Sequence, residues 1–129
     1  YIANVVAPIE QASAGTFVTG TITLQGFAID LTSSAGTGID RVHIYLDGLY
    51  DLGGATYGLD RPNIAARYGA RFGPSGWELV WDASGATPGV HSLYLYAHRT
   101  TDDAWTVLSP HLVVVRGEHG LWLPLGLKN

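Results

Sequence analysis

Tyrosine and histidine side chains recur at every second position in two stretches of this chain. Residues 40–48 and 89–98 alternate aliphatic residues with polar or aromatic ones. In a β-strand, this period of two places the aliphatic residues on one face and the tyrosines and histidines on the other. The predicted outer face carries His43, Tyr45, Tyr94, Tyr96 and His98. Exposed aromatic rings can stack on sugars or anchor a protein interface, whereas the simpler interpretation is ordinary cross-strand pairing within a sheet.

A metal site is not predicted, because metal ions need several ligands that converge on one point. No HxH, HExxH or CxxC pattern occurs, so His43 and His98 are expected to be solvent-exposed residues of a sheet. Calcium would use oxygen ligands from loops, but the chain has no EF-hand spacing. The loop aspartates have simpler roles, with Asp102 and Asp103 as a turn pair and Asp60 as a helix cap. The sequence therefore predicts no metal ligands and no cofactor.

Residue patterns typical of catalysis are also missing from the sequence. The stretch around Ser75 is not a GxSxG elbow, and it precedes a predicted strand rather than a helix. Glu78 and Asp82 have ordinary roles on the outer face and at the end of a strand, although a pair of carboxylates is what a glycosidase uses. The glycine pairs do not form a phosphate-binding loop. The sequence therefore favours a protein that is not an enzyme.

Composition narrows the class of protein further. The net charge is −4 without a cluster of Lys or Arg, so no nucleic-acid partner is predicted. No apolar run reaches the roughly 20 residues of a membrane span. The low charged fraction of 14% and the 17 glycines are typical of short strands joined by tight turns. The chain has no cysteine and no methionine, even at position 1, which favours a mature form or an excised part of a longer product.

The spacing of strand and turn patterns predicts an all-β fold. Strand candidates recur about every 8–12 residues, as in β-sandwiches. Residues 17–29 are expected to form one long strand, and residues 105–115 a strand broken by Pro110. A helical pattern occurs at residues 60–69, with Pro62 in the first turn and Gly69 at the end. The predicted core comprises Val42, Ile44, Leu46, Trp77, Trp81, Leu93, Leu95 and Trp105.

Residues 18–115 resemble bacterial Ig-like domains of secreted and surface proteins. The motifs that carry the resemblance are Gly38-Ile39-Asp40, Leu46-Asp47-Gly48, Tyr57-Gly58, Arg61-Pro62-Asn63, Gly76-Trp77, Pro88-Gly89-Val90-His91, Tyr96-Ala97 and Trp105. The strand and turn patterns predict seven to eight strands and one short helix, and the resemblance implies that they form an Ig-like antiparallel β-sandwich. The ending LWLPLGLKN is similar to the Leu-Pro-Leu tails of exported Chloroflexi-type proteins. Together these resemblances imply a secreted, extracellular or cell-surface location.

The predicted domain organisation is a sandwich over residues 1–116 and an apolar tail strand over residues 117–129. The tail places alternate leucines on one face, and its candidate assembly residues are Leu121, Trp122, Leu123, Leu125 and Leu127. Such a strand either completes its own sandwich or adds to a neighbouring molecule. The sequence favours a non-catalytic bacterial structural protein that self-assembles into a homo-oligomer or a filament by strand donation from a terminus. The alternatives are a carbohydrate-binding or adhesive module with a surface glycan as partner, and an accessory domain of a secreted enzyme.

Overall fold

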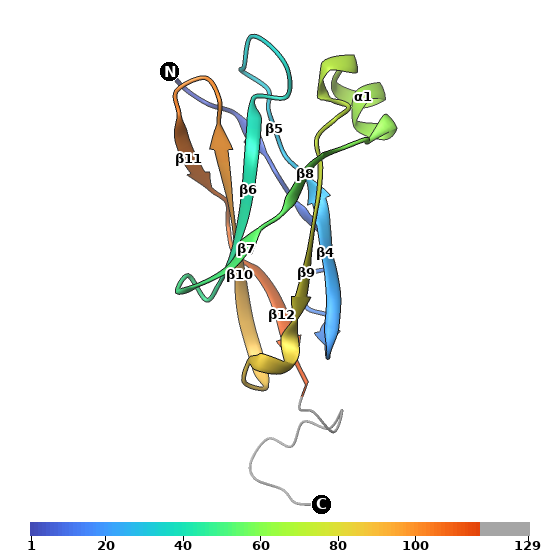
Figure 1. The fold of residues 1–129 in the computed structure, drawn as a ribbon, viewed down its shortest axis with the longest axis vertical. Helices are drawn as coiled ribbons and strands as arrows, with labels where there is room; N and C mark the ends of the chain where they lie inside the picture. The colour runs from blue at the N-terminus through green and yellow to red at the C-terminus, as the bar shows by residue number, and fades with distance from the viewer. Residues whose placement is uncertain (117–129) are drawn as a thin grey trace, which may run out of the picture.

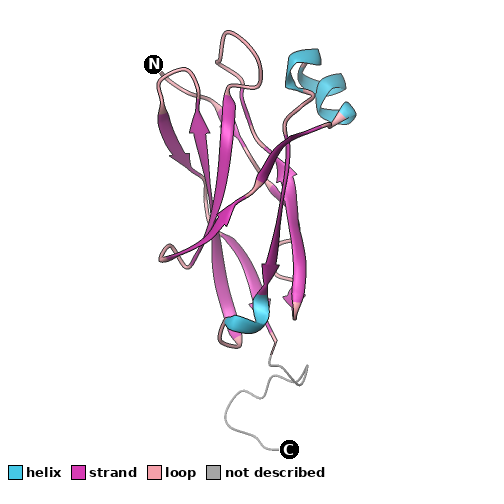
Figure 2. Ribbon diagram, viewed as in Figure 1, coloured by secondary structure: helices cyan, strands magenta, loops and turns pink. Residues whose placement is uncertain are grey.

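The structure, a computed structural model, describes residues 1–116 of the chain. Strands dominate it, with one short α-helix and two 3₁₀ helices (Figure 2). The strands are β1 (Val5–Val6), β2 (Ile9–Gln11), β3 (Phe17–Val18), β4 (Thr21–Phe27), β5 (Ile29–Asp30), β6 (Ile39–Leu46), β7 (Tyr50–Gly54), β8 (Thr56–Leu59), β9 (Gly76–Asp82), β10 (Gly89–Arg99), β11 (Ala104–Val107) and β12 (His111–Val115). The helices are α1 (Pro62–Tyr68), η1 (Ala70–Phe72) and η2 (Ala83–Gly85). The predicted all-β class is confirmed.

The strands form two main layers that pack face to face in a β-sandwich-like arrangement (Figure 1). The larger sheet has six strands in the order β3-β12-β10-β6-β7, with β11 also paired to β10. The smaller sheet has the order β2-β4-β9-β8, and β1 pairs separately with β5. The pairing of β3 with β12 is parallel, so the prediction of a wholly antiparallel fold is wrong at this edge.

The core lies between the two layers and follows from the period-two pattern of the central strands. In β6 and β10 the aliphatic residues point inward, where they meet Trp77 and Trp81 of β9. The predicted core residues that are buried in this cluster are Val42, Ile44, Leu46, Trp77, Trp81, Leu93 and Leu95. The alternation of the sequence is therefore confirmed for these strands, and it leaves the tyrosines of β6 and β10 on the outer face.

The predicted count of seven to eight strands is wrong, because the described residues contain twelve. The expected long strand over residues 17–29 is divided into β3, β4 and β5. Gly20, with a φ of 65° that strand residues do not adopt, separates the first two. Pro110 falls between β11 and β12, as predicted, since proline has no amide hydrogen for the ladder.

The predicted helix is present as α1, which lies at one end of the sandwich (Figure 1). Pro62 is its first residue and Gly69 its C-cap, as the sequence indicates. The expected cap at Asp60 is wrong, because the N-cap is Arg61 and no side chain of the described residues caps the helix there. Buried Ile64 anchors the helix in a small second cluster with Phe27, Ile29 and Phe72. No helix among residues 1–116 is long and apolar enough to cross a bilayer.

Candidate functional site

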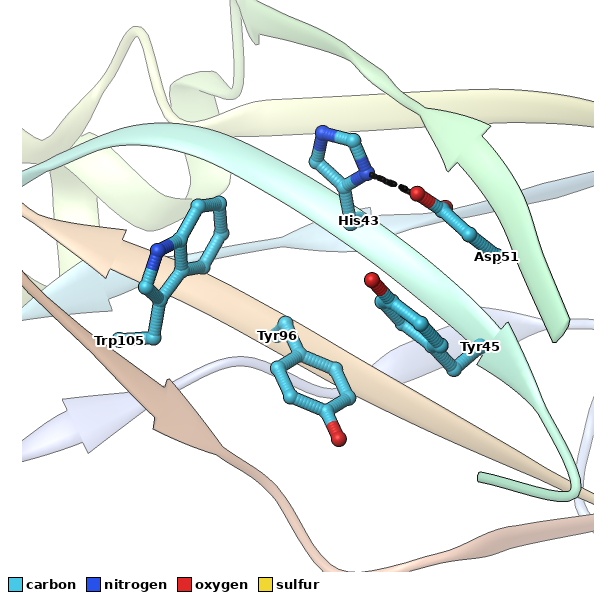
Figure 3. Close-up of a pocket in the computed structure, with 5 residues that line it drawn as sticks. All are labelled: His43, Tyr45, Asp51, Tyr96 and Trp105. Atoms are coloured by element: carbon cyan, nitrogen blue, oxygen red, sulfur yellow. Dashed lines mark hydrogen bonds and ion pairs between the residues drawn. The ribbon is translucent and has the colours of Figure 1, made fainter. Parts of the chain in front are cut away.

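A pocket of about 320 Å³ opens on the outer face of the larger sheet. Its walls come from four neighbouring strands, with Asp51 on β7, His43 and Tyr45 on β6, Tyr96 on β10 and Trp105 on β11 (Figure 3). Because the strands lie side by side in this order, the pocket crosses them and gathers residues that are far apart in the sequence. Three of the five predicted binding-face residues, namely His43, Tyr45 and Tyr96, are brought together here.

The aromatic rings form the walls of a cleft rather than a flat platform. The Tyr45 and Tyr96 ring centroids are 4.6 Å apart, and their planes are inclined by 48°. The His43 and Trp105 centroids are 5.8 Å apart, and their planes are nearly perpendicular at 86°. Aromatic pairs favour tilted and edge-to-face arrangements of this kind, which leave part of each ring free for another contact.

One side of the pocket is polar. His43 Nδ1 lies 3.2 Å from each carboxylate oxygen of Asp51, and the Gly53 N–H donates to Asp51 Oδ1 at 2.8 Å. Burial acts to raise the pKa of Asp51, but the hydrogen bonds from Gly53 and His43 outweigh it and hold that pKa below its ordinary value. A Cβ atom at Gly54 would lie 3.2 Å from His43 Nε2, so glycine leaves room for the imidazole. The pocket thus offers an ionised acceptor beside three aromatic rings.

Trp105 is part of this pocket, and the prediction that it belongs to the core is wrong. Its exposed fraction is 40%, and it pairs with His98 across the β10–β11 hairpin. Residues directly opposite in a ladder share one face of the sheet. The four-residue turn at residues 100–103 sets this register, so Trp105 lies on the same face of the sheet as His98. The face of Trp105 therefore depends on this one-residue register, and nothing in the sequence singled out Asp51.

The two other predicted binding-face residues do not line the pocket. Tyr94 lies on the same face but near the turn between β6 and β7, where a Cβ atom at Gly48 would be 3.7 Å from the Tyr94 ring. His98 is only 5% exposed, so the prediction of a solvent-exposed histidine is wrong. The physical reason is that Trp105 covers it, with the two ring centroids 4.9 Å apart.

The other predicted sites have no counterpart in the pocket. The assembly residues Leu121, Trp122, Leu123, Leu125 and Leu127 lie outside the described residues. Among residues 1–116, no group of three or more His, Cys, Asp or Glu side chains is arranged to hold a metal ion.

The two aspartates of the turn at residues 100–103 contact different partners. Asp102 accepts hydrogen bonds from Arg99 Nε at 2.9 Å and Nη2 at 2.7 Å. Asp103 instead contacts His98.

Comparison with known proteins gives a likeness in fold. No family model matches the chain, and no curated protein matches it. Among solved structures, the X-ray structure of the endo-β-1,4-mannanase from Thermotoga petrophila is similar, with a TM-score of 0.55 and 11% sequence identity. The match covers 92% of this chain but 20% of that chain, so this chain spans about a fifth of the enzyme's length. At this identity the likeness concerns the fold alone.

Proposed function

We propose that this chain is a non-catalytic carbohydrate-binding module, of the bacterial Ig-like type, that serves as an accessory unit of an extracellular glycan-active protein. The observation that carries the proposal is the pocket of Tyr45, Tyr96 and Trp105 with the Asp51 carboxylate at its side. Aromatic faces stack on the apolar faces of sugar rings, and an ionised carboxylate accepts hydrogen bonds from sugar hydroxyl groups. The fold likeness to part of an endo-β-1,4-mannanase supports an accessory role.

The shape of the pocket favours a single soluble polysaccharide chain over a flat crystalline surface. A flat surface would require aromatic rings that share a plane, whereas the rings here are inclined by 48° and 86°. A cavity of about 320 Å³ is at the small end of the range for ligand pockets. We therefore expect the module to contact only a short stretch of the chain.

The proposal that the module is not catalytic rests on the polar groups of the pocket. Hydrolysis of a glycosidic bond uses two carboxyl groups that flank the bond. Among residues 1–116, the one carboxylate that lines the pocket is that of Asp51, which is already held by His43 and Gly53. This arrangement is suited to recognition of hydroxyl groups rather than to acid–base chemistry.

Affinity electrophoresis in gels that contain soluble β-1,4-mannan, glucomannan or hydroxyethyl cellulose tests the proposal. We expect wild-type protein to be retarded by at least one polysaccharide, and Trp105→Ala and Tyr96→Ala to migrate as in a gel without polysaccharide. Tyr94→Ala is the matched control, because Tyr94 lies on the same strand and face but does not line the pocket. Choline serves as a competing ligand, since aromatic cages also bind quaternary ammonium groups. Lack of retardation on every polysaccharide would overturn the proposal, as would equal losses in Tyr94→Ala.

Self-association through a terminal strand is a separate hypothesis that the sequence favours. The tail residues that it would use lie outside the described part of the chain, so the pocket neither supports nor opposes it. Deletion of residues 121–129, followed by sedimentation analysis and electron microscopy of both proteins, tests it. Fibres formed by the wild type and a folded monomer after deletion would support strand donation, whereas a wild-type monomer at high concentration would contradict it.

A further inference from the structure

His98 lies beneath the Trp105 wall of the pocket and is held from both sides. Its Nδ1 is 2.6 Å from Asp40 Oδ1, and its Nε2 is 2.7 Å from Asp103 Oδ1. The two aspartate carboxylates thus contact both nitrogens of the ring. The first aspartate belongs to β6 and the second to the turn before β11. The imidazole therefore links two separate segments and has one orientation between them.

Trp105 rests directly on this imidazole. The planes of the two rings are inclined by 64°, with the centroids 4.9 Å apart. The Arg41 guanidinium lies 5.2 Å from the Trp105 ring centroid, and its Nε is 4.0 Å from Asp40 Oδ1. Arg99 Nη1 donates to the backbone carbonyl oxygen of Trp105 at 3.3 Å. The indole thus contacts His98 and Arg41, and it also lines the pocket.

Stability alone is a poor explanation for this cluster. Burying a polar or charged ring costs free energy unless it is fully paired, and an apolar side chain at the same position is often as stable or more so. Asp103 also has a φ of 54°, in the left-handed region that residues other than glycine seldom adopt. A buried histidine with two carboxylate partners does, however, give one fixed ring orientation, which apolar packing does not guarantee.

We infer that Asp40, His98 and Asp103 are positioning residues that hold the Trp105 indole at the wall of the pocket. The three residues set the orientation of the Trp105 ring although they do not line the pocket. The expected effect on sugar binding rests on the proposed function. The inference concerns the orientation of Trp105 itself, however, and this can be measured without a ligand.

Substitutions of Asp103 separate positioning from folding. Asp103→Gly removes the carboxylate but keeps the left-handed backbone, which glycine adopts readily. Asp103→Asn also tolerates this backbone and retains an oxygen that accepts the His98 Nε2 hydrogen. Asp47→Gly is the matched control, because Asp47 has a φ of 56° in another turn and lies 2.6 Å from His91 Nδ1. Asp47 does not line the pocket.

The readouts are the ¹H–¹⁵N resonance of the Trp105 indole, assigned with Trp105→Phe, and the dissociation constant for the polysaccharide that retards the wild type. In Asp103→Gly we expect the resonance to shift or broaden, and affinity to fall by about fivefold or more. Asp103→Asn should restore the resonance and most of the affinity, and Asp47→Gly should change neither. An unchanged resonance in Asp103→Gly would overturn the inference, as would a shift of the same size in Asp47→Gly. If the wild type binds no polysaccharide, the proposed function fails, but the resonance still decides the positioning role.

Discussion

The inner and outer faces of β6 and β10 differ in what holds their side chains in place. On the inner face, Ile44 and Leu95 are fully buried against a second sheet, and their neighbours are aliphatic or tryptophan side chains. On the outer face, Tyr45 and Tyr96 are covered only in part, by each other and by side chains of β7 and β11. Close packing therefore determines the inner face, whereas specific ring and hydrogen-bond contacts determine the outer one. We expect inner substitutions to change stability and outer substitutions to change binding.

The largest expected effect is the loss of an inner tryptophan. Trp81→Ala should lower the free energy of unfolding by about 3–5 kcal/mol, because it leaves a large cavity between the sheets. Trp105→Ala, on the outer face and 40% exposed, should cost only about 1–2 kcal/mol. Urea denaturation followed by circular dichroism measures both values. Equal losses in the two variants would contradict the distinction between the faces.

A polar group on the inner side of the sandwich should give an intermediate effect. The Tyr57 hydroxyl lies 2.6 Å from the Ala28 carbonyl oxygen and 2.8 Å from Thr37 Oγ1. Burial raises the pKa of Tyr57 from 10.0 to about 12, so the folded state retains this proton more strongly than the unfolded chain. The resulting stabilisation is fully present below pH 10 and is lost as the pH rises toward 12. We expect an alkaline decrease in stability on the order of 2 kcal/mol.

Tyr57→Phe is the control for this alkaline effect, because it removes the titrating group and keeps the ring. Thermal melts of both proteins at a series of alkaline pH values provide the measurement. The wild-type melting temperature should fall more steeply with pH than that of the variant. Parallel pH profiles would show that Tyr57 ionises as easily in the folded state as in the unfolded chain.

A smaller effect is expected from His91 and Asp47, which pair at the far end of β10 from His98. Burial acts to lower the pKa of His91, but hydrogen bonds to Asp47 and to the Thr87 carbonyl outweigh it and raise that pKa above 6.5. Burial acts to raise the pKa of Asp47, but the Ser92 N–H and His91 hold it below 3.8. The stabilisation that His91 contributes is therefore lost as the pH rises from 6.5 through its raised pKa. The stabilisation that Asp47 contributes is lost as the pH falls from 3.8 through its lowered pKa.

The size of this contribution should be about 1 kcal/mol or less, because the Asp47 carboxylate is partly exposed to solvent. Chemical denaturation between pH 5 and pH 8 measures this contribution, because the interval spans the ordinary histidine pKa of about 6.5. His91→Gln is the variant without a titrating ring. The wild type should lose stability relative to the variant as the pH rises across this interval. A wild type that gains stability relative to the variant would show that the sign is wrong.

The smallest expected effect concerns Ser75, which is fully buried in the segment just before β9. Its Oγ has no hydrogen-bond partner among residues 1–116. An unpaired buried hydroxyl opposes folding, so Ser75→Ala should leave stability within about 0.5 kcal/mol of wild type or raise it slightly. Tyr57→Phe is the comparison variant, because it removes a hydroxyl group that has hydrogen-bond partners. A loss in Ser75→Ala as large as the loss in Tyr57→Phe at neutral pH would contradict this explanation.

The sequence by itself determined the inner face, the all-β class and the place of α1. Alternation in β6 and β10 is local and repeats over several residues, so one period assigns Ile44 and Leu95 to the core before any strand pairing is known. Likewise, Pro62 and Gly69 lie at the two ends of the helix because the restrictions on their backbone are properties of single residues.

Only the tertiary structure decided the composition of the pocket. Asp51 and Trp105 reach it because β7 pairs with one side of β6, and β11 with the free side of β10. Trp105 is predicted as a core residue because tryptophan is largely apolar, yet β11 extends the larger sheet and the Trp105 side chain lies on its outer face, where it covers His98. Local periodicity tells which side chains share a face of one strand, whereas the register and order of strands far apart in the sequence decide which of them meet.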